Sequence, residues 1–157
     1  MKKFRLIILL ALLSACDSAK VFEENKAFES HIWSVENHPI FQVEIKDTLS
    51  EMNIIMNIRH SARYPFSNLW LFVNTTNPEG VQIKDTIECV LAAKDGRWLG
   101  SGLGDIWDIQ IPLKTQTFSS SGNYVFEIEQ AMRYGNKGRI EQLPEIMNIG
   151  FRIEKKE

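Results

Sequence analysis

Apolar and polar residues alternate over much of this chain after residue 27, with the period of two that is typical of half-buried β-strands. The clearest stretches are 41–45, 52–58, 107–113 and 124–128. In each stretch, one set of side chains is expected to face a core while the other set faces solvent, although Ile55 interrupts the polar set of its strand.

Two further segments are more apolar than simple alternation requires. Residues 68–73 are apolar on both faces, which predicts a central strand of a two-layer structure. A long strand interrupted only by Asp85 is expected to place five side chains on one face, those of Val81, Ile83, Ile87, Cys89 and Leu91. Residues 143–147 are predicted to form one helical turn before a last strand at 149–153.

Glycine-containing sequences mark the turns. Lys94-Asp95-Gly96 predicts a hairpin, because Asp-Gly readily adopts the positive φ angles of tight turns. The later run Gly100-Ser101-Gly102-Leu103-Gly104 does not fit a phosphate-binding loop, since its third glycine falls one residue early, a strand follows and the P-loop lysine is missing. A bulged β-turn is expected there, and Pro112 favours an edge position for its strand.

About eight short strands separated by turns predict an all-β fold, an antiparallel β-sandwich. The connections are short, whereas parallel crossovers need roughly a dozen residues or more. No segment has the length and period of a substantial helix. Immunoglobulin-like and jelly-roll strand orders both agree with this pattern.

Residues 1–15 have the organisation of a bacterial lipoprotein signal peptide. Three basic residues precede residues 6–13, an unbroken apolar stretch. As a helix this stretch is about 12 Å long, well short of the ~30 Å hydrocarbon core, so it cannot span a membrane. Leu13-Ser14-Ala15-Cys16 then resembles the bacterial lipobox. An ordinary signal peptide with a cysteine nearby is the alternative; we expect cleavage before Cys16 and acylation of that cysteine.

The remainder divides into residues 16–26, a lipidated N-terminus and polar tether, and residues 27–157, one β-sandwich domain. Membrane attachment is expected through the lipid anchor. Loss of the leader leaves 15 of the 18 basic residues against 20 acidic ones, and the absence of a basic stripe excludes nucleic acid as a partner. Cys89 is then the only other thiol, which excludes a disulfide framework within the chain.

Residues with catalytic or metal-binding chemistry are scattered. His31, His38 and His60 lack the close spacing of helical or finger-type zinc sites. No strand-turn sequence such as Gly-x-Ser-x-Gly marks a nucleophile. Glu127 and Glu129 share a strand face, which we interpret as a solvated outer face rather than a catalytic pair. We therefore expect no enzyme, no cofactor or metal, and no small-molecule substrate.

Aromatic residues and arginines offer a candidate surface for binding proteins, because Trp, Tyr and Arg are enriched at binding hot spots. The candidate contact residues are Arg59, Tyr64, Trp70, Arg97 and Trp98. Alternatively, the tryptophans fill the core and the arginines lie at its rim. A second function class is a surface carbohydrate-binding sandwich that uses Trp98 and Trp107 against sugar rings.

Several of these residues lie in blocks that resemble the gliding-motility lipoprotein GldH family of the Bacteroidetes. The blocks are Ile58-Arg59, Tyr64-Pro65-Phe66-Ser67-Asn68-Leu69-Trp70-Leu71-Phe72, Gly96-Arg97-Trp98-Leu99-Gly100-Ser101-Gly102, Gly122-Asn123-Tyr124, Glu129-Gln130-Ala131-Met132-Arg133 and Ile149-Gly150-Phe151-Arg152. The resemblance implies an accessory lipoprotein of the gliding and type IX secretion machinery, with envelope proteins as partners and no catalytic residues to carry over. We expect the outer membrane, on its periplasmic face.

The phylum implied by this resemblance glycosylates Asp-Ser/Thr-small or apolar triplets in the periplasm. Three triplets match, and they make Ser18, Thr48 and Thr86 candidate O-glycosylation sites. Ser18 in the tether and Thr48 in a turn are better candidates than Thr86, which is expected within a strand.

Overall fold

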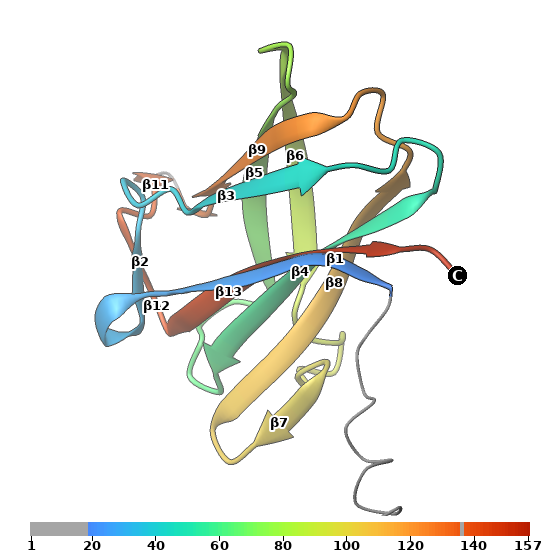
Figure 1. Ribbon diagram of the computed structural model, residues 1–157. Helices are drawn as coiled ribbons and strands as arrows, with labels where there is room; N and C mark the ends of the chain where they lie inside the picture. The colour runs from blue at the N-terminus through green and yellow to red at the C-terminus, as the bar shows by residue number, and fades with distance from the viewer. Residues whose placement is uncertain (1–18, 136) are drawn as a thin grey trace, which may run out of the picture.

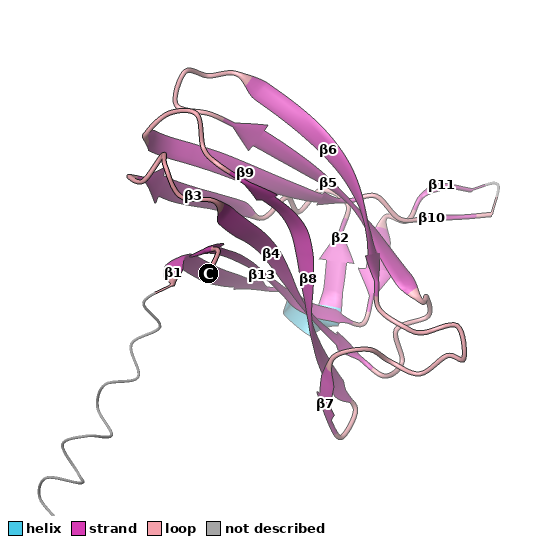
Figure 2. Cartoon of the chain, turned by 90° about the vertical axis from the view of Figure 1, so that its right-hand side faces the viewer, coloured by secondary structure: helices cyan, strands magenta, loops and turns pink. Residues whose placement is uncertain are grey.

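The computed structural model describes residues 19–135 and 137–157, so the signal peptide, Cys16 and Ser18 lie outside the described residues. Two β-sheets pack face to face as a sandwich (Figures 1 and 2). One sheet has the order β1 (Lys20–Ala27), β13 (Ile146–Lys155), β4 (Met52–Ser61), β8 (Ile106–Gln116) and β7 (Ser101–Leu103). The other has the order β3 (Ile40–Ile45), β9 (Gly122–Gln130), β5 (Asn68–Thr76) and β6 (Gln82–Val90).

Shorter elements close one end of the sandwich. Strand β2 (Ile32–Ser34) pairs with β12 (Gln142–Pro144), and β10 (Arg133–Tyr134) pairs with β11 (Lys137–Arg139). A single 3-10 turn, η1 (Glu29–His31), connects β1 to β2. Within the described ranges, no helix has the length and apolar character needed to cross a membrane.

The pairing of the long strands settles the strand order. All the pairs are antiparallel, and β1 pairs with β13, β3 with β9, β4 with β8 and β5 with β6. Among the eight long strands, the first therefore pairs with the last, the second with the seventh, the third with the sixth and the fourth with the fifth. This nested order is that of a jelly roll. The predicted antiparallel sandwich is confirmed, and of its two possible strand orders the jelly roll is the one found.

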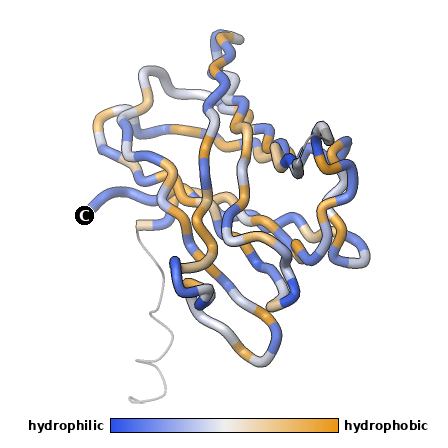
Figure 3. Tube along the Cα trace, turned by 180° about the vertical axis from the view of Figure 1, so that it is seen from behind, coloured by the Kyte–Doolittle hydropathy of each residue, from blue (hydrophilic) through white to orange (hydrophobic). Residues whose placement is uncertain are grey.

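The core lies between the sheets and follows the predicted alternation. Figure 3 shows hydrophobic and hydrophilic positions alternating along the strands. The ring of Phe151 on β13 lies 5.4 Å from that of Phe41 on β3 and 4.5 Å from that of Phe126 on β9, and these contacts join the two sheets. Such aromatic pairs add stability beyond the apolar area that they bury.

Strands β5 and β6 extend the sandwich on one side. In β5, Leu69, Leu71 and Val73 are buried in the core, whereas Trp70 and Phe72 lie on the outer face. In β6, Cys89 is buried but Ile83 is 57% exposed, because the far end of this hairpin extends past the opposite sheet (Figure 1). The side chains predicted to share one face of β6 do share it, but the opposite sheet covers only those near the end of the strand that contains Cys89.

Two predicted boundaries are wrong. The tether was expected to reach residue 26, but β1 begins at Lys20 and pairs along its length with β13. Its inward positions include Glu24 and Lys26, so the strand lacks the apolar alternation that would reveal it. The helical turn expected at 143–147 is absent. Glu145 instead has a φ of 67° and forms a bend between β12 and β13.

The hairpin predicted at Gly96 is confirmed, whereas the run at 100–104, expected to be a bulged turn, contains the short strand β7 and turns only at Gly104 and Asp105. The Gly96 N–H donates to the carbonyl of Ala93 at 2.9 Å, which closes the predicted hairpin. Gly100 has a φ of 84°, and a Cβ at this position would lie 2.1 Å from the carbonyl oxygen of Asp108. Pro112 occupies an edge as expected, because β7 pairs with β8 only over residues 106–108.

Candidate functional site

Two of the five predicted contact residues pack into the structure instead. Tyr64 is 3% exposed, and its hydroxyl donates to the carbonyl oxygen of Asn68 at 3.0 Å. Burial strongly raises the pKa of Tyr64. The ring of Trp98 is half-buried, 4.6 Å from the ring of His60 and 6.5 Å from that of Tyr64. The prediction that Tyr64 lies near a contact surface is therefore wrong, since it is a core residue.

The other three predicted contact residues lie apart. Arg59 is on the outer face of the five-stranded sheet, where it donates twice to Asp108, at 2.7 and 3.0 Å. Trp70, which is 38% exposed, lies on the outer face of the opposite sheet. Arg97 is exposed in the hairpin, with its Nε 4.0 Å from Asp95. These residues do not form one surface.

The two tryptophans suggested as platforms for carbohydrate are only partly exposed. Trp98 is packed against His60, as described above. Trp107 is half-buried and lies against the backbone of Gly102, where a Cβ would approach the indole ring to 2.8 Å. The protein itself therefore packs against part of each indole ring.

A group of apolar side chains around Trp70 forms a more coherent surface, hereafter the aromatic surface. Its members are Phe66, Trp70, Phe72, Met132 and Tyr134. Tyr134 is 67% exposed, and its ring lies 6.2 Å from that of Phe66. Two hydrogen bonds of the Trp70 backbone fix the arrangement: its N–H donates to the side-chain sulfur of Met132 at 3.2 Å, and its carbonyl accepts from the N–H of Ala131 at 2.8 Å.

Sequence reasoning found only Trp70 of this surface. Phe72 lies two residues later on the same outer face, and its ring is covered by the ammonium of Lys84 at 4.1 Å. The sequence did contain one indication of Phe72, because residues 68–73 are apolar on both faces. In a two-layer sandwich one face of each strand points away from the core, so half of these apolar side chains had to lie on the outside. Phe66 and Tyr134 come from a loop and a short hairpin, where no periodicity identifies the exposed side.

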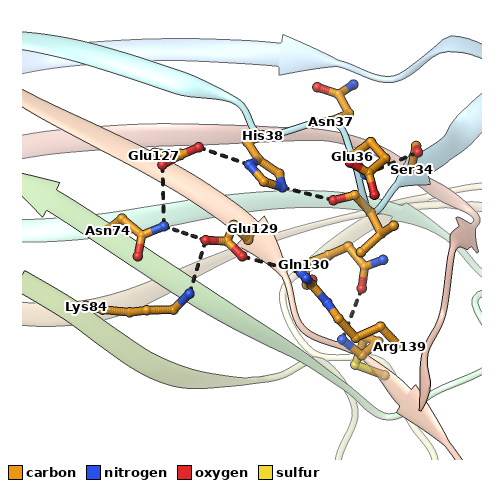
Figure 4. A network of polar contacts seen from close by, with 12 residues as sticks. Ser34, Glu36, Asn37, His38, Asn74, Lys84, Glu127, Glu129, Gln130 and Arg139 are labelled. Atoms are coloured by element: carbon orange, nitrogen blue, oxygen red, sulfur yellow. Dashed lines mark hydrogen bonds and ion pairs between the residues drawn. The ribbon is translucent and has the colours of Figure 1, made fainter.

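A polar network borders the aromatic surface on the outer face of the four-stranded sheet (Figure 4). Glu129 is 12% exposed and pairs with Lys84 at 3.2 Å and Arg139 at 3.4 Å. Burial raises the pKa of Glu129, but the hydrogen bond from Asn74 and the contact with Lys84 outweigh this effect and leave its pKa below the usual value. The interpretation of a simply solvated face is therefore wrong at Glu129.

The same network holds the one metal-type cluster found within the described residues. One ligand atom each from His38, Glu127 and Glu129 lie within 4.8 Å of one another. His38 Nδ1 is 2.9 Å from Glu127, and its Nε2 is 3.0 Å from the carbonyl oxygen of Val35. A cation would have to compete with Lys84 for Glu129, so these residues are better described as an ion-pair network. Spacing alone did not reveal the group, because His38 and Glu127 are 89 residues apart.

The candidate glycosylation sites have different surroundings. Thr48 is half-buried in the loop after β3, beside Asp47, whose carboxylate accepts from Lys155 at 2.7 Å. This hydrogen bond and others from Ser50 lower the pKa of Asp47 strongly. Thr86 is exposed on the outer face of β6, within a strand as expected.

Comparison with known proteins identifies the family. The sequence profile described as GldH lipoprotein matches residues 20–153, nearly the whole described chain. The chain belongs to the GldH lipoprotein family. Members of this family are lipoproteins, so a lipid-anchored position in the cell envelope follows for this chain. The predicted lipidation of Cys16 lies outside the described residues and stays a prediction.

Relatives within the GldH family match over nearly their full length. The gliding motility lipoprotein GldH of Flavobacterium johnsoniae is 36% identical over 154 residues, which cover 96% of this chain and 96% of the relative. The gliding motility lipoprotein GldH homolog of Christiangramia forsetii is 34% identical over 154 residues, with coverages of 97% and 94%. A structure of infectious bursal disease virus, strain Gx, aligns over 89% of this chain and 34% of its own, with 13% identity and a TM-score of 0.28. That alignment is too loose to support an argument.

Proposed function

We propose that this GldH-family lipoprotein is a non-catalytic interaction component of the gliding and type IX secretion machinery, anchored on the periplasmic face of the outer membrane. The observation that supports the proposal best is the aromatic surface. Trp70 and Tyr134 are exposed there, and within the described residues no element covers them. Exposed apolar groups of this kind mark binding sites more often than scattered single residues do.

The position of the anchor favours the same surface. Since β1 begins at Lys20, only residues 17–19 lie between the acylated cysteine and the sandwich, so the two can be about 14 Å apart at most. Figure 1 places β11, which borders the aromatic surface, at the end of the sandwich opposite the start of β1. The anchored domain would therefore present the aromatic surface away from its own point of attachment.

Reactive groups of the described chain support a role without catalysis. Cys89 is fully buried, and burial raises the pKa of its thiol to about 12, so very little of the nucleophilic thiolate forms at neutral pH. His60 is also fully buried, among Tyr64 and Trp98, and lies away from the surface. These environments suit packing better than proton transfer to a substrate.

In-cell crosslinking followed by affinity purification tests the proposal. Trp70→Ala and Tyr134→Ala should each reduce the recovery of crosslinked envelope proteins severalfold, because each removes an exposed aromatic side chain from the surface. Leu103→Ala is the matched control, since Leu103 is 89% exposed on β7, an edge strand of the other sheet. Unchanged recovery with both aromatic variants would overturn this assignment of the surface.

A further inference from the structure

The outer face of the five-stranded sheet contains a groove of a different character, hereafter the polar groove. Its side chains are mainly amides and charged groups, from Glu23, Asn25, Asn57, Arg59, Asp108, Gln110 and Asn148. All five strands of the sheet contribute to the groove, in the order β1, β13, β4, β8 and β7, the last through Ser101. It lies on the side of the sandwich opposite the aromatic surface.

Strand register aligns the amides of this groove. Asn25 pairs with Gly150, Gly150 with Asn57, and Asn57 with Gln110. These four residues therefore form one row perpendicular to the strands, at intervals of about 4.8 Å. Side chains in a row of this kind point to the same side of the sheet, so three amides are presented together.

Gly150 leaves space between two of the amides in this row. A Cβ at this position would lie 2.1 Å from Oδ1 of Asn25 and 3.1 Å from Cβ of Asn57. Glycine weakens the interior of a strand, and at such positions it often marks the close approach of another group. Here it makes room for the two neighbouring amides to converge.

The charged groups of the groove neutralise one another. Arg59 and Asp108 form a two-bond pair, and Glu23 lies 3.2 Å from Arg152. An anionic ligand such as a phosphate would need unpaired cations, which this lining does not offer. The lining instead provides neutral donors and acceptors, since each amide has both.

Asn57 has hydrogen-bonding capacity that the described residues do not use. Its Nδ2 donates to Glu23 only over a long 3.4 Å, and its Oδ1 is buried without a hydrogen-bond partner. Buried acceptors in native proteins are nearly always paired, so an unpaired one requires an explanation. A bound molecule with hydroxyl donors would supply the partner after a small rotation of the amide.

We propose that the polar groove binds a neutral, polyhydroxylated glycan chain. Each hydroxyl both donates and accepts, which matches a row of amides, and an open groove across a sheet admits a chain. Extended peptides fit less well, because they pair with the edge of a sheet or insert side chains into apolar pockets. The inner strands of this face, β13 and β4, are paired on both sides, so an added peptide strand could pair only at the margins of the groove, with β1 or the free part of β8, and not across the row of amides.

Microscale thermophoresis of the detergent-solubilised, full-length lipoprotein tests the proposal. The probes are hexaoses of glucose, mannose and N-acetylglucosamine, and a neutral Gly/Ser/Asn-rich peptide of similar length. At least one hexaose should bind, and Gln110→Ala and Asn57→Ala should each weaken it at least tenfold. Gln42→Ala, at an exposed position on the opposite sheet, is the matched control and should leave the affinity unchanged.

The possible outcomes distinguish between sources of the glycan, and they test the polar groove separately from the aromatic surface. Binding of the N-acetylglucosamine hexaose alone indicates a peptidoglycan-type strand, and binding of the other hexaoses indicates an unsubstituted polysaccharide; both support the proposal. Trp70→Ala should reduce partner recovery without changing glycan affinity. Binding of the peptide alone, no hexaose binding at millimolar concentration, or wild-type affinity in the exposed Gln110→Ala variant would overturn it.

Discussion

The hydroxyl of Tyr64 donates to the backbone carbonyl of Asn68 at 3.0 Å, and this bond ties the loop after β4 to the first residue of β5. Only 3% of the surface of Tyr64 remains exposed. The bond therefore belongs to the core of the sandwich and helps to place the strand that carries Trp70.

Tyr64→Phe is expected to lower the free energy of unfolding by ~1 kcal/mol, because it leaves the ring in place and removes one buried hydrogen bond. Urea unfolding measures the change. Crosslinked partner recovery should stay at the wild-type level, since the hydroxyl does not reach the surface. A stable Tyr64→Phe protein that loses its partners would show that Tyr64 does contact them.

The two hairpin glycines provide a matched pair for testing backbone strain. Gly96 and Gly100 both have a φ of 84°, but a Cβ on Gly96 would meet no atom within 4 Å. Gly96→Ala should therefore cost only the ~1–2 kcal/mol of the left-handed conformation. Gly100→Ala should cost more, because its Cβ would also collide with the backbone of Asp108. Thermal unfolding of both variants checks this order, and equal losses would contradict it.

Cys89 is expected to resist alkylation in the native protein. Burial raises the pKa of its thiol to about 12, and the side chain is 0% exposed. Iodoacetamide at pH 8 should modify Cys89 at a rate set by unfolding, and rapidly once urea unfolds the chain. Mass spectrometry of the peptide that contains Cys89 measures both rates. Rapid modification of the folded protein would mean that β6 opens locally.

Protease treatment of intact cells tests on which side of the outer membrane the domain lies. A domain on the periplasmic face of the outer membrane should survive, and it should be cut once the outer membrane is permeabilised. Tyr134 is exposed in strand β10 of the short β10–β11 hairpin, a region where cleavage is expected. Cleavage in intact cells would place the domain on the cell surface and contradict the proposed location.

The alternation of apolar and polar residues correctly predicted those strands whose inward-facing side chains are apolar. Residues 41–45 and 124–128 bury every second side chain as expected. Strand β1 escaped detection, since Phe22 is the one large apolar residue on its inward side and backbone bonds to β13 hold it instead. The nested order of strands could not be inferred, because pairs such as β1 and β13 join the two ends of the chain and no local pattern records their contact.

The candidate site was harder to predict for a physical reason. Trp, Tyr and Arg are enriched at interfaces, but aromatic residues fill cores equally well, so composition could not separate Tyr64 from Trp70. Only the fold shows that one points inward and the other outward. The amide row is likewise invisible in sequence, because Asn25, Asn57 and Gln110 meet through strand register alone.

His60 is expected to make stability depend on pH. It is 0% exposed, and burial lowers the pKa of His60 below its ordinary value of 6.5, although the hydrogen bond to the Ser61 carbonyl and the charge of Asp108 oppose this shift. The unfolded chain therefore binds a proton more readily than the folded one. The free energy of unfolding should be fully retained above about pH 6.5 and should decrease as the pH falls below it.

Urea unfolding at pH 7.5 and 5.5 measures this dependence. The loss at pH 5.5 should be smaller in His60→Gln and unchanged in His31→Asn, which replaces an exposed histidine. If His60→Gln does not fold, an NMR titration of the wild-type imidazole decides instead. Protonation of His60 in the folded protein with an ordinary midpoint would contradict the prediction, because a histidine enclosed by Tyr64 and Trp98 should remain neutral until the core opens.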